Sequence, residues 1–301
     1  MNLKQMATLA AVAELGSVSR AATALGQAQS LVSRQVAQLE QEWGDRLFAR
    51  TGRGVALTDF GRQLMPQVRR VLAEVEQLGA SVHEAAGALT GTVYLGVLPT
   101  LSGHLLPQLL AVLQAEARGV RLCVTEGFSG DLDEQLGAGR LDMIVVNRYG
   151  TTALRGEDAL GVIDTCLLGA PQLPLMRARS IGLRQLDGLP LVLPALPNGM
   201  RTMLDQLAAR HRIAIDVVME VDTATAMKGV AASGQAYTLL PAMAAQAEIA
   251  QGLLAAVPVE RPAIKRTIAL GLTRQRPVSR AARFVATRVR QLAVQALTPQ
   301  R

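Results

Sequence analysis

The sequence predicts an N-terminal all-α winged helix-turn-helix with a long linker helix, followed by a C-terminal α/β region. Three observations support this fold class. The first 60 residues contain short helical segments and a glycine-flanked hairpin, apolar residues recur in heptads between positions 64 and 82, and strand-like runs alternate with helical segments after residue 90. A chain of 301 residues is long enough for two or three compact units.

The net charge of the chain is +7 and is unevenly distributed. Residues 1–70 hold nine Lys or Arg against five Asp or Glu, and residues 260–301 hold ten against one. A basic excess suits an anionic partner, but a basic helix is more often a solvated face, so charge alone does not establish DNA binding. A hydrophobic content of 50% with 18% charged residues argues against a disordered chain.

Cysteine usage and the N-terminus indicate the cellular compartment. Cys123 and Cys166 lie in the apolar runs VRLCV and TCLLG, and we expect buried, reduced thiols rather than a disulfide. The N-terminus is a poor signal peptide, and no apolar run reaches the roughly 20 residues that would span a membrane. We therefore expect a cytoplasmic protein without a membrane partner.

The N-terminal segment is expected to form three helices. Apolar residues at helical spacing predict the first over 3–15, and the second, over 20–25, is preceded by serines that can cap it. Both end at a glycine. The third is expected over 29–43, and its inward face is formed by residues spaced i, i+4 and i+7, namely Val32, Val36 and Leu39.

The opposite face of the third helix is polar and cationic. Such a face fits the major groove of DNA, where Gln and Arg make bidentate contacts with adenine and guanine edges. Serine hydroxyls would mostly position the domain on phosphates. The residues of the second and third helices expected to contact DNA are Ser19, Gln29, Ser30, Ser33 and Arg34.

A basic hairpin is expected directly after these helices. The segment ARTGRGVAL contains two short extended runs around a glycine-flanked turn, with Arg50 and Arg53 at its tip. An amphipathic three-helix unit alone is more often only a solvated structure, but a basic hairpin beside it can reach the adjacent minor groove. The hairpin therefore favours DNA binding, and Arg50, Arg53 and the following Thr58 join the expected DNA contacts.

The helix that begins at Thr58 is expected to run to about residue 86 and to carry a coiled-coil seam, with an early interruption at Pro66. Its apolar face could pack on its own domain or on a second copy. We favour a second copy, because a dimer of such domains would bind a pseudo-palindromic site. The expected dimerisation residues are Leu64, Val68, Val71, Val75, Leu78 and Val82.

The segment SRAATALGQAQSLVSRQVAQLEQEWGDRLFARTGRGVALTDFG resembles the signature of LysR-type transcriptional regulators. The chain departs from the family at Ala28 and Ser30, where Ser and Pro are usual, and at Gln27, which replaces an apolar residue. These changes alter the start of the recognition helix. LPALPNGMR and VDTATAMKGVAASGQAYTLLP most resemble the subgroup that contains the nitrogen assimilation control protein. The residues that match the signature are Ala21, Ala22, Gln29, Ser33, Arg34, Gln35, Leu39, Glu40, Leu47, Phe48, Arg50, Leu57, Thr58 and Gly61.

After residue 91, strands and helices are expected to alternate. The runs 92–99, 120–127 and 141–147 predict strands buried on both faces, separated by helices, and this alternation predicts a parallel sheet covered by helices. A second set of strands is expected over 189–194, 216–221, 236–241 and 267–273, with helices over 200–211, 224–232 and 279–297.

The family resemblance implies two Rossmann-like subdomains, as in type 2 periplasmic binding proteins, joined by crossovers near 161–165 and 262–266. The resulting division assigns 1–58 to the winged helix-turn-helix, 59–90 to the linker and dimerisation helix, and 91–301 to an effector-binding domain. Within it, subdomain I comprises 91–162 and 266–301, and subdomain II comprises 163–265.

Candidate effector ligands follow the ends of the predicted strands, because ligands of open α/β sheets bind there, beside helix N-termini. Hydroxyl, amide and guanidinium groups at these junctions suit a small anionic effector. Helix capping or surface exposure explains any single one equally well, and Arg201 could instead pair with Asp205. The candidates are Thr100, Ser102, Phe128, Ser129, Asn147, Asn198, Arg201 and Thr223.

These features favour a sequence-specific DNA-binding regulator modulated by a small effector. The alternatives are an α/β small-molecule receptor or an enzyme without a specific role on DNA. The three histidines lack metal-ligand spacing, and no GxSxG, P-loop or HExxH motif occurs, so we expect no catalytic residues, metal or cofactor. The resemblance implies double-stranded DNA, an effector and further copies of the chain (a dimer or tetramer) as partners, with RNA polymerase as an additional candidate.

Overall fold

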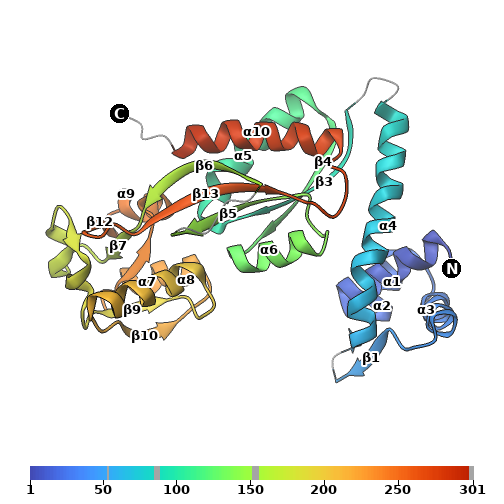
Figure 1. The fold of residues 1–301 in the computed structure, drawn as a ribbon, viewed down its shortest axis with the longest axis horizontal. Coiled ribbons are helices and arrows are strands. Elements are labelled where there is room, and N and C mark those ends of the chain that lie inside the picture. The colour runs from blue at the N-terminus through green and yellow to red at the C-terminus, as the bar shows by residue number, and fades with distance from the viewer. Residues whose placement is uncertain (53, 85–88, 151–155, 298–301) are drawn as a thin grey trace.

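The computed structural model describes residues 1–52, 54–84, 89–150 and 156–297. A small helical domain and a larger α/β domain are joined by the long helix α4 (Asp59–Glu84), as Figure 1 shows. The predicted fold class is therefore confirmed.

Three helices form the N-terminal domain: α1 (Leu3–Leu15), α2 (Val18–Ala24) and α3 (Gln29–Trp43). Helix α2 begins two residues before its predicted start, because the Ser17 hydroxyl accepts a hydrogen bond from the Arg20 N–H. The helices otherwise follow the predicted ranges, since their apolar residues repeat with the helical period. Their buried side chains include Met6, Leu9, Val12, Ala21, Ala22, Val32, Val36 and Leu39.

The predicted hairpin is present as β1 (Phe48–Thr51) and β2 (Gly54–Leu57), which pair antiparallel. Gly54 has a φ of 144°, and a Cβ there would lie 2.3 Å from the carbonyl oxygen of Gly16. The Val55 N–H donates to that same oxygen at 2.9 Å. Only glycine fits this approach, so the hairpin is held against the turn between α1 and α2.

Five strands form the first sheet of the α/β domain, in the order β4-β3-β5-β13-β6. Strand β3 is parallel to both of its neighbours, whereas β13 is antiparallel to β5 and β6. The predicted all-parallel sheet is therefore wrong, because β13 returns from the second subdomain in the opposite direction. The strands are β3 (Thr90–Val97), β4 (Gly119–Glu126), β5 (Met143–Tyr149), β6 (Glu157–Asp164) and β13 (Lys265–Leu272).

Helices cover both faces of this sheet. Figure 1 shows α5 (Pro99–Glu116) and α10 (Arg280–Leu297) on one face, where they share a core with β3 and β5, and α6 (Ser129–Gly137) on the other. Strand β4 lies at the edge, so its predicted burial on both faces is wrong and Cys123 is only half-buried. Cys166 is buried, as predicted, and its burial raises the pKa of its thiol.

The second subdomain contains a four-stranded sheet in the order β11-β7-β12-β8 and the parallel pair β9 and β10. The sequence patterns predicted β9, β10 and β11 with their helices, but they did not identify β6, β8 and β12. Strand β8 is only two residues long, and β12 contains Pro258. The strands are β7 (Cys166–Gly169), β8 (Ile181–Gly182), β9 (Pro190–Leu193), β10 (Asp216–Glu220), β11 (Thr238–Leu240) and β12 (Ala255–Glu260). The α-helices are α7 (Gly199–His211), α8 (Ala224–Ala232) and α9 (Gln246–Ala250), and the 3-10 helices are Pro174–Arg177, Leu183–Leu186 and Ala242–Ala245.

Two adjacent connections join the subdomains. Thr165 links β6 to β7, and residues 261–264 link β12 to β13. The Thr165 N–H donates to the Ile264 carbonyl at 2.9 Å, so the two connections lie side by side. Arg266, two residues further on, is only 3% exposed. The chain therefore carries a buried guanidinium at the junction of the subdomains.

The basic residues of α10 largely face acidic partners. Arg288 pairs with Glu116 of α5, and Arg290 pairs with Asp158 of β6. These pairs attach the helix to the first subdomain. They support the interpretation of the basic C-terminal segment as a solvated structural face rather than a nucleic-acid surface.

Candidate DNA interface and effector cleft

Helix α3 and the hairpin present an exposed polar face. Arg53 of the hairpin tip lies outside the described residues. Thr58 requires a correction: its hydroxyl donates to the Arg46 carbonyl at 2.6 Å and accepts from the Gly61 N–H at 3.0 Å, so it caps α4 instead of offering a free DNA contact. The predicted DNA-contacting residues that are exposed are Ser19, Gln29, Ser30, Ser33, Arg34 and Arg50.

Two polar residues that belong to the family signature point inward. Gln35 is 8% exposed, and its Oε1 lies 2.6 Å from the hydroxyl of Thr8 on α1. Glu40 accepts hydrogen bonds from the Leu47 N–H at 2.7 Å and the Phe48 N–H at 3.2 Å. The first contact fixes α3 against α1, and the second fixes the start of the hairpin against α3. Both therefore set the geometry of the exposed face.

The structure divides the predicted dimerisation seam of α4. Leu64 and Val68 pack in the core of the N-terminal domain, and Val68 is only 4% exposed, so these two residues are not free to form a seam. For this part of α4, packing on its own domain is the correct alternative. The side chain of Val82 lies outside the described residues. The exposed members of the seam are Val71, Val75 and Leu78.

An apolar groove adjoins this exposed stretch. It has a volume of about 420 Å³ and lies between the start of α1, Trp43 of α3 and the first turns of α4. Val71, 40% exposed, lines one end of it, and Met1, 59% exposed, lines another part. The groove and the exposed valines form a continuous apolar surface of a kind that marks a protein interface.

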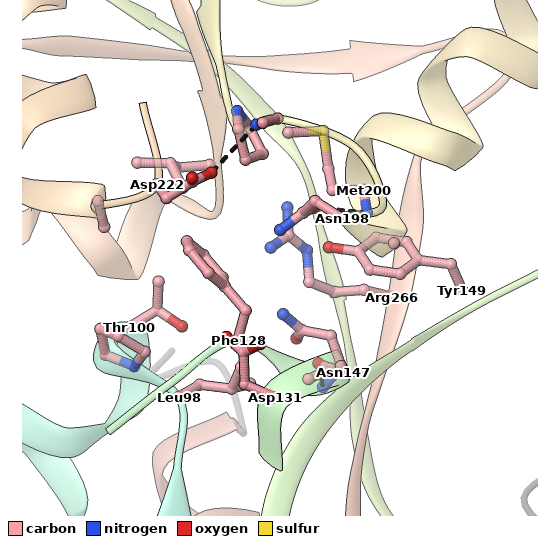
Figure 2. A pocket seen from close by; sticks show the side chains of 18 of the residues that line it. Leu98, Thr100, Phe128, Asp131, Asn147, Tyr149, Asn198, Met200, Asp222 and Arg266 are labelled. Atoms are coloured by element: carbon pink, nitrogen blue, oxygen red, sulfur yellow. Dashed lines mark hydrogen bonds between the residues drawn. The ribbon is translucent and has the colours of Figure 1, made fainter. Parts of the chain in front are cut away.

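A cleft of about 240 Å³ lies between the two subdomains of the α/β domain (Figure 2). The first subdomain contributes the N-terminal ends of α5 and α6 and the end of β5. The second contributes the segment from β9 to α7 and the start of α8. The predicted effector residues that line the cleft are Thr100, Phe128, Ser129, Asn147 and Asn198.

Arg266 supplies the buried positive charge of the cleft. Its Nη2 donates to the Thr165 hydroxyl at 2.8 Å, and its Cζ lies 5.5 Å from the centroid of the Tyr149 ring. Figure 2 shows the guanidinium beside Tyr149 and directed towards Asn198. Within the described part of the chain, its Nε has no hydrogen-bond acceptor and no carboxylate pairs with the group. A buried cation in this state favours an anionic ligand.

Asn147 adds an amide to the cleft. Its backbone N–H donates to the Ser129 hydroxyl at 3.0 Å, which connects β5 to the N-terminus of α6. Its side-chain Oδ1 is buried and has no hydrogen-bond donor among the described residues. The two carboxylates that line the cleft, Asp131 and Asp222, are exposed at its edge, and Asp222 accepts the Ala195 N–H at 3.1 Å. Negative charge therefore lies at the edge and positive charge in the interior.

Three predicted effector residues do not line the cleft. The Ser102 hydroxyl bonds a backbone carbonyl within α5 at 3.2 Å, and the Thr223 hydroxyl caps α8. Arg201 pairs with Asp205 at 3.0 Å and with Glu220 at 2.8 Å, which neutralises its charge. Helix capping and the Asp205 pair, the alternatives left open from the sequence, are therefore correct for these residues.

Sequence reasoning did not identify Arg266 or Tyr149. The search covered the carboxyl ends of strands, whereas Arg266 lies near the amino end of β13 and reaches the cleft because that strand is antiparallel to β5. One signal was available. A strand as apolar as KRTIALGL does not usually begin with a buried arginine, and a buried charge needs a partner.

Neither a metal cluster nor a membrane span is found within the described ranges. No three His, Cys, Asp or Glu side chains there lie close enough together to hold a metal ion. None of the helices there combines the length and apolar character needed to cross a bilayer.

Two family models match the chain. Residues 3–62 match the bacterial regulatory helix-turn-helix protein of the lysR family, and residues 86–293 match the LysR substrate binding domain. The chain is 30% identical over 247 residues to the nitrogen assimilation regulatory protein nac of Escherichia coli strain K12, covering 82% of this chain and 80% of that protein. The resemblance to this subgroup is therefore confirmed. The chain is also 28% identical to the HTH-type transcriptional regulator BbuR of Bordetella bronchiseptica, covering 96% and 90% of the two chains.

Solved structures share the fold over the full chain. A full-length OxyR variant from Pseudomonas aeruginosa has a TM-score of 0.74 and 23% identity, covering 100% of this chain and 98% of that one. Full-length CbnR, solved in complex with its target DNA, has a TM-score of 0.67 and 20% identity, covering 99% and 100%. At this level of identity the likeness concerns the fold.

Proposed function

The chain belongs to the LysR family of DNA-binding transcriptional regulators with an effector-binding domain, and we propose that a small anionic effector bound in its interdomain cleft controls its action on DNA. The observation that carries this proposal is the buried guanidinium of Arg266, whose Nε has no acceptor among the described residues. A carboxylate bound there would supply the acceptor, and the Asn147 and Asn198 amides would orient it.

The division of labour follows the elements. We assign residues 1–58 to DNA binding, 59–90 to the linker and dimerisation helix, and 91–301 to effector binding, with 91–162 and 266–301 as one subdomain and 163–265 as the other. The exposed side chains of α3 would read base edges, and Arg50 of the hairpin would contact phosphates or the minor groove.

Self-association completes the proposal. The exposed Val71, Val75 and Leu78 and the adjoining apolar groove support pairing of two copies, and pairing of the α/β domains would give a tetramer. Two helix-turn-helix domains held in this way would bind a pseudo-palindromic promoter site. We further infer action in the cytoplasm and contact with RNA polymerase, as expected for a transcriptional regulator, and no enzymatic role.

The mechanism follows from the position of Arg266. It lies at the junction of both crossovers, so an effector that engages it together with Asn198 contacts both subdomains at once. Such a ligand binds the closed cleft more tightly than the open cleft and shifts the population towards closure. Closure would then change the spacing of the DNA-binding domains within the oligomer.

The test is a calorimetric titration of the full chain with a panel of small mono-, di- and tricarboxylates. Arg266→Gln should weaken binding of the best carboxylate by about 10- to 100-fold, since a hydrogen bond to a charged group contributes about 1.5–3 kcal/mol. Arg210→Gln, which removes an exposed guanidinium from α7 outside the cleft, is the matched control and should bind as the wild type does. Equal affinity of Arg266→Gln and wild type would refute the proposed site.

A further inference from the structure

A second cavity, of about 450 Å³, lies between the N-terminal domain and the α/β domain. One wall comes from α1 and α4 and includes Arg69 and Leu72. The other comes from β3, β4 and the segment after α6, and includes Arg140. Figure 1 shows α4 standing beside the end of the α/β domain from which these segments come. The cavity exists only where the two domains meet, and it is separate from the effector cleft.

Positive charge predominates in this cavity. Three guanidinium groups line it, from Arg69, Arg140 and Arg276, against one carboxylate, from Glu14. Arg276 is paired with Asp142 at 2.7 Å, and both are largely buried.

The other two arginines are less well neutralised. Arg140 contacts Glu134 at 3.1 Å, but the Glu134 side chain is 78% exposed, so water screens this pair. Arg69 has no hydrogen bond or ion pair with any described residue. Two guanidinium groups from different domains thus face one cavity without sufficient negative charge.

The like charges affect each other across the domain boundary. Burial lowers the pKa of Arg69, the nearby Arg140 lowers it further, and Glu14 raises it again. In addition, the Nε of Arg140 is buried and lacks an acceptor among the described residues. Repulsion between Arg69 and Arg140 opposes this arrangement of the domains, and an anion between them would remove it.

We propose that this interdomain cavity is a second anion-binding site, where a small polyvalent anion, a di- or tricarboxylate or a phosphate, bridges Arg69 of the linker helix and Arg140 of the α/β domain. Thr125 and Gln135, which also line the cavity, provide polar groups for its remaining oxygens. The volume of the cavity falls within the range of small-molecule sites, and the side chains of Leu72 and Leu141 add an apolar wall.

The site couples ligand binding to the arrangement of the domains. Because each domain contributes one arginine, the anion binds the arrangement in which they meet and stabilises it by mass action. By reciprocity, anything that moves the linker helix away from the α/β domain weakens the site. Anion concentration would thereby influence the presentation of α3 independently of the effector cleft.

The experiment measures citrate and pyrophosphate binding to the full chain by calorimetry, with acetate at matched ionic strength as the monovalent control. Arg69→Gln and Arg140→Gln should each weaken citrate or pyrophosphate binding at least tenfold. Arg70→Gln, an equal loss of charge at an exposed neighbouring position on α4, should change it less than twofold. Arg266→Gln should leave it intact, because Arg266 belongs to the other cavity.

A carboxylate-specific site responds to citrate alone, a phosphate-specific site to pyrophosphate alone, and either result supports the proposal. Arg69→Glu provides a second readout: it replaces repulsion by an ion pair with Arg140, so the ligand-free variant should unfold at a higher temperature and no longer respond to citrate or pyrophosphate. Binding that is absent in the wild type, unchanged in Arg69→Gln and Arg140→Gln, or lost in Arg266→Gln overturns the proposal. So does an Arg69→Glu variant that responds like the wild type.

Discussion

Arg266 and Tyr149 are direct partners across strands β13 and β5, and the guanidinium carbon lies 5.5 Å from the centroid of the ring. Burial raises the pKa of the Tyr149 hydroxyl and the nearby guanidinium lowers it, so the ring stays neutral at physiological pH. A neutral aromatic face stabilises the cation without neutralising it. Strand register therefore holds an uncompensated positive charge at the junction of the subdomains.

Thr165→Val should destabilise the α/β domain. The Thr165 hydroxyl is fully buried and accepts a hydrogen bond from Arg266 Nη2, so the substitution leaves a buried charged donor unpaired. We expect the free energy of unfolding to fall by about 1–3 kcal/mol, measured by urea denaturation. A saturating carboxylate ligand of the cleft should restore part of the loss, because it supplies a new acceptor. Unchanged stability would mean that another group satisfies Arg266.

Arg34→Ala should reduce specific DNA binding. Arg34 is exposed on α3, so its removal should not affect folding. If it contacts a base edge, we expect a loss of about 1–3 kcal/mol on the promoter site and a smaller one on random DNA, measured by gel-shift titration at two salt concentrations. Arg50→Ala on the hairpin is the comparison, and should weaken both by similar factors. An equal loss on both DNAs for Arg34→Ala would identify a phosphate contact instead.

The double substitution of Val71 and Leu78 by Asp should dissociate the dimer. These side chains are 40% and 66% exposed, so the change costs little within one chain but places charges in the proposed seam. Sedimentation velocity should then show the monomer. Val218→Asp is a matched control, because this valine of β10 is 53% exposed and distant from α4 in sequence. A dimer that survives the double substitution would exclude this seam.

Glu248→Gln should lower stability at neutral pH but not in acid. The hydrogen bond from Lys228, at 2.6 Å, lowers the pKa of Glu248, and burial raises it by less. Because the folded pKa lies below the ordinary value of 4.5, the contribution is complete above that value and is lost as the pH falls through the folded pKa. We expect a loss of about 1 kcal/mol at pH 7, measured by urea denaturation.

The difference between Glu248→Gln and wild type should then disappear below a pH of about 4. Glu126→Gln, at an exposed position on β4, is the control and should change stability little at either pH. A difference that stays constant down to the acid range would show that packing of the Glu248 side chain, and not its charge, stabilises the contact between α8 and α9.

Local periodicity was sufficient for the elements and for the DNA-binding face. Val32, Val36 and Leu39 share one side of α3, which leaves Ser33 and Arg34 exposed whatever the remainder of the chain does. The turn signals around Gly16 and Gly54 likewise predicted the hairpin, and the signature predicted the family. These features depend on neighbours within a few residues, so the sequence by itself determined them.

The partners of particular side chains were decided only by the tertiary structure. Leu64 and Val71 occupy equivalent positions in one heptad pattern, yet the first is packed on its own domain and the second is exposed, because the N-terminal domain covers only the first turns of α4. Arg266 reaches the cleft because β13 crosses back antiparallel to β5, beside a strand more than a hundred residues earlier. No local pattern records such a contact, since its free energy depends on which distant segments pack together.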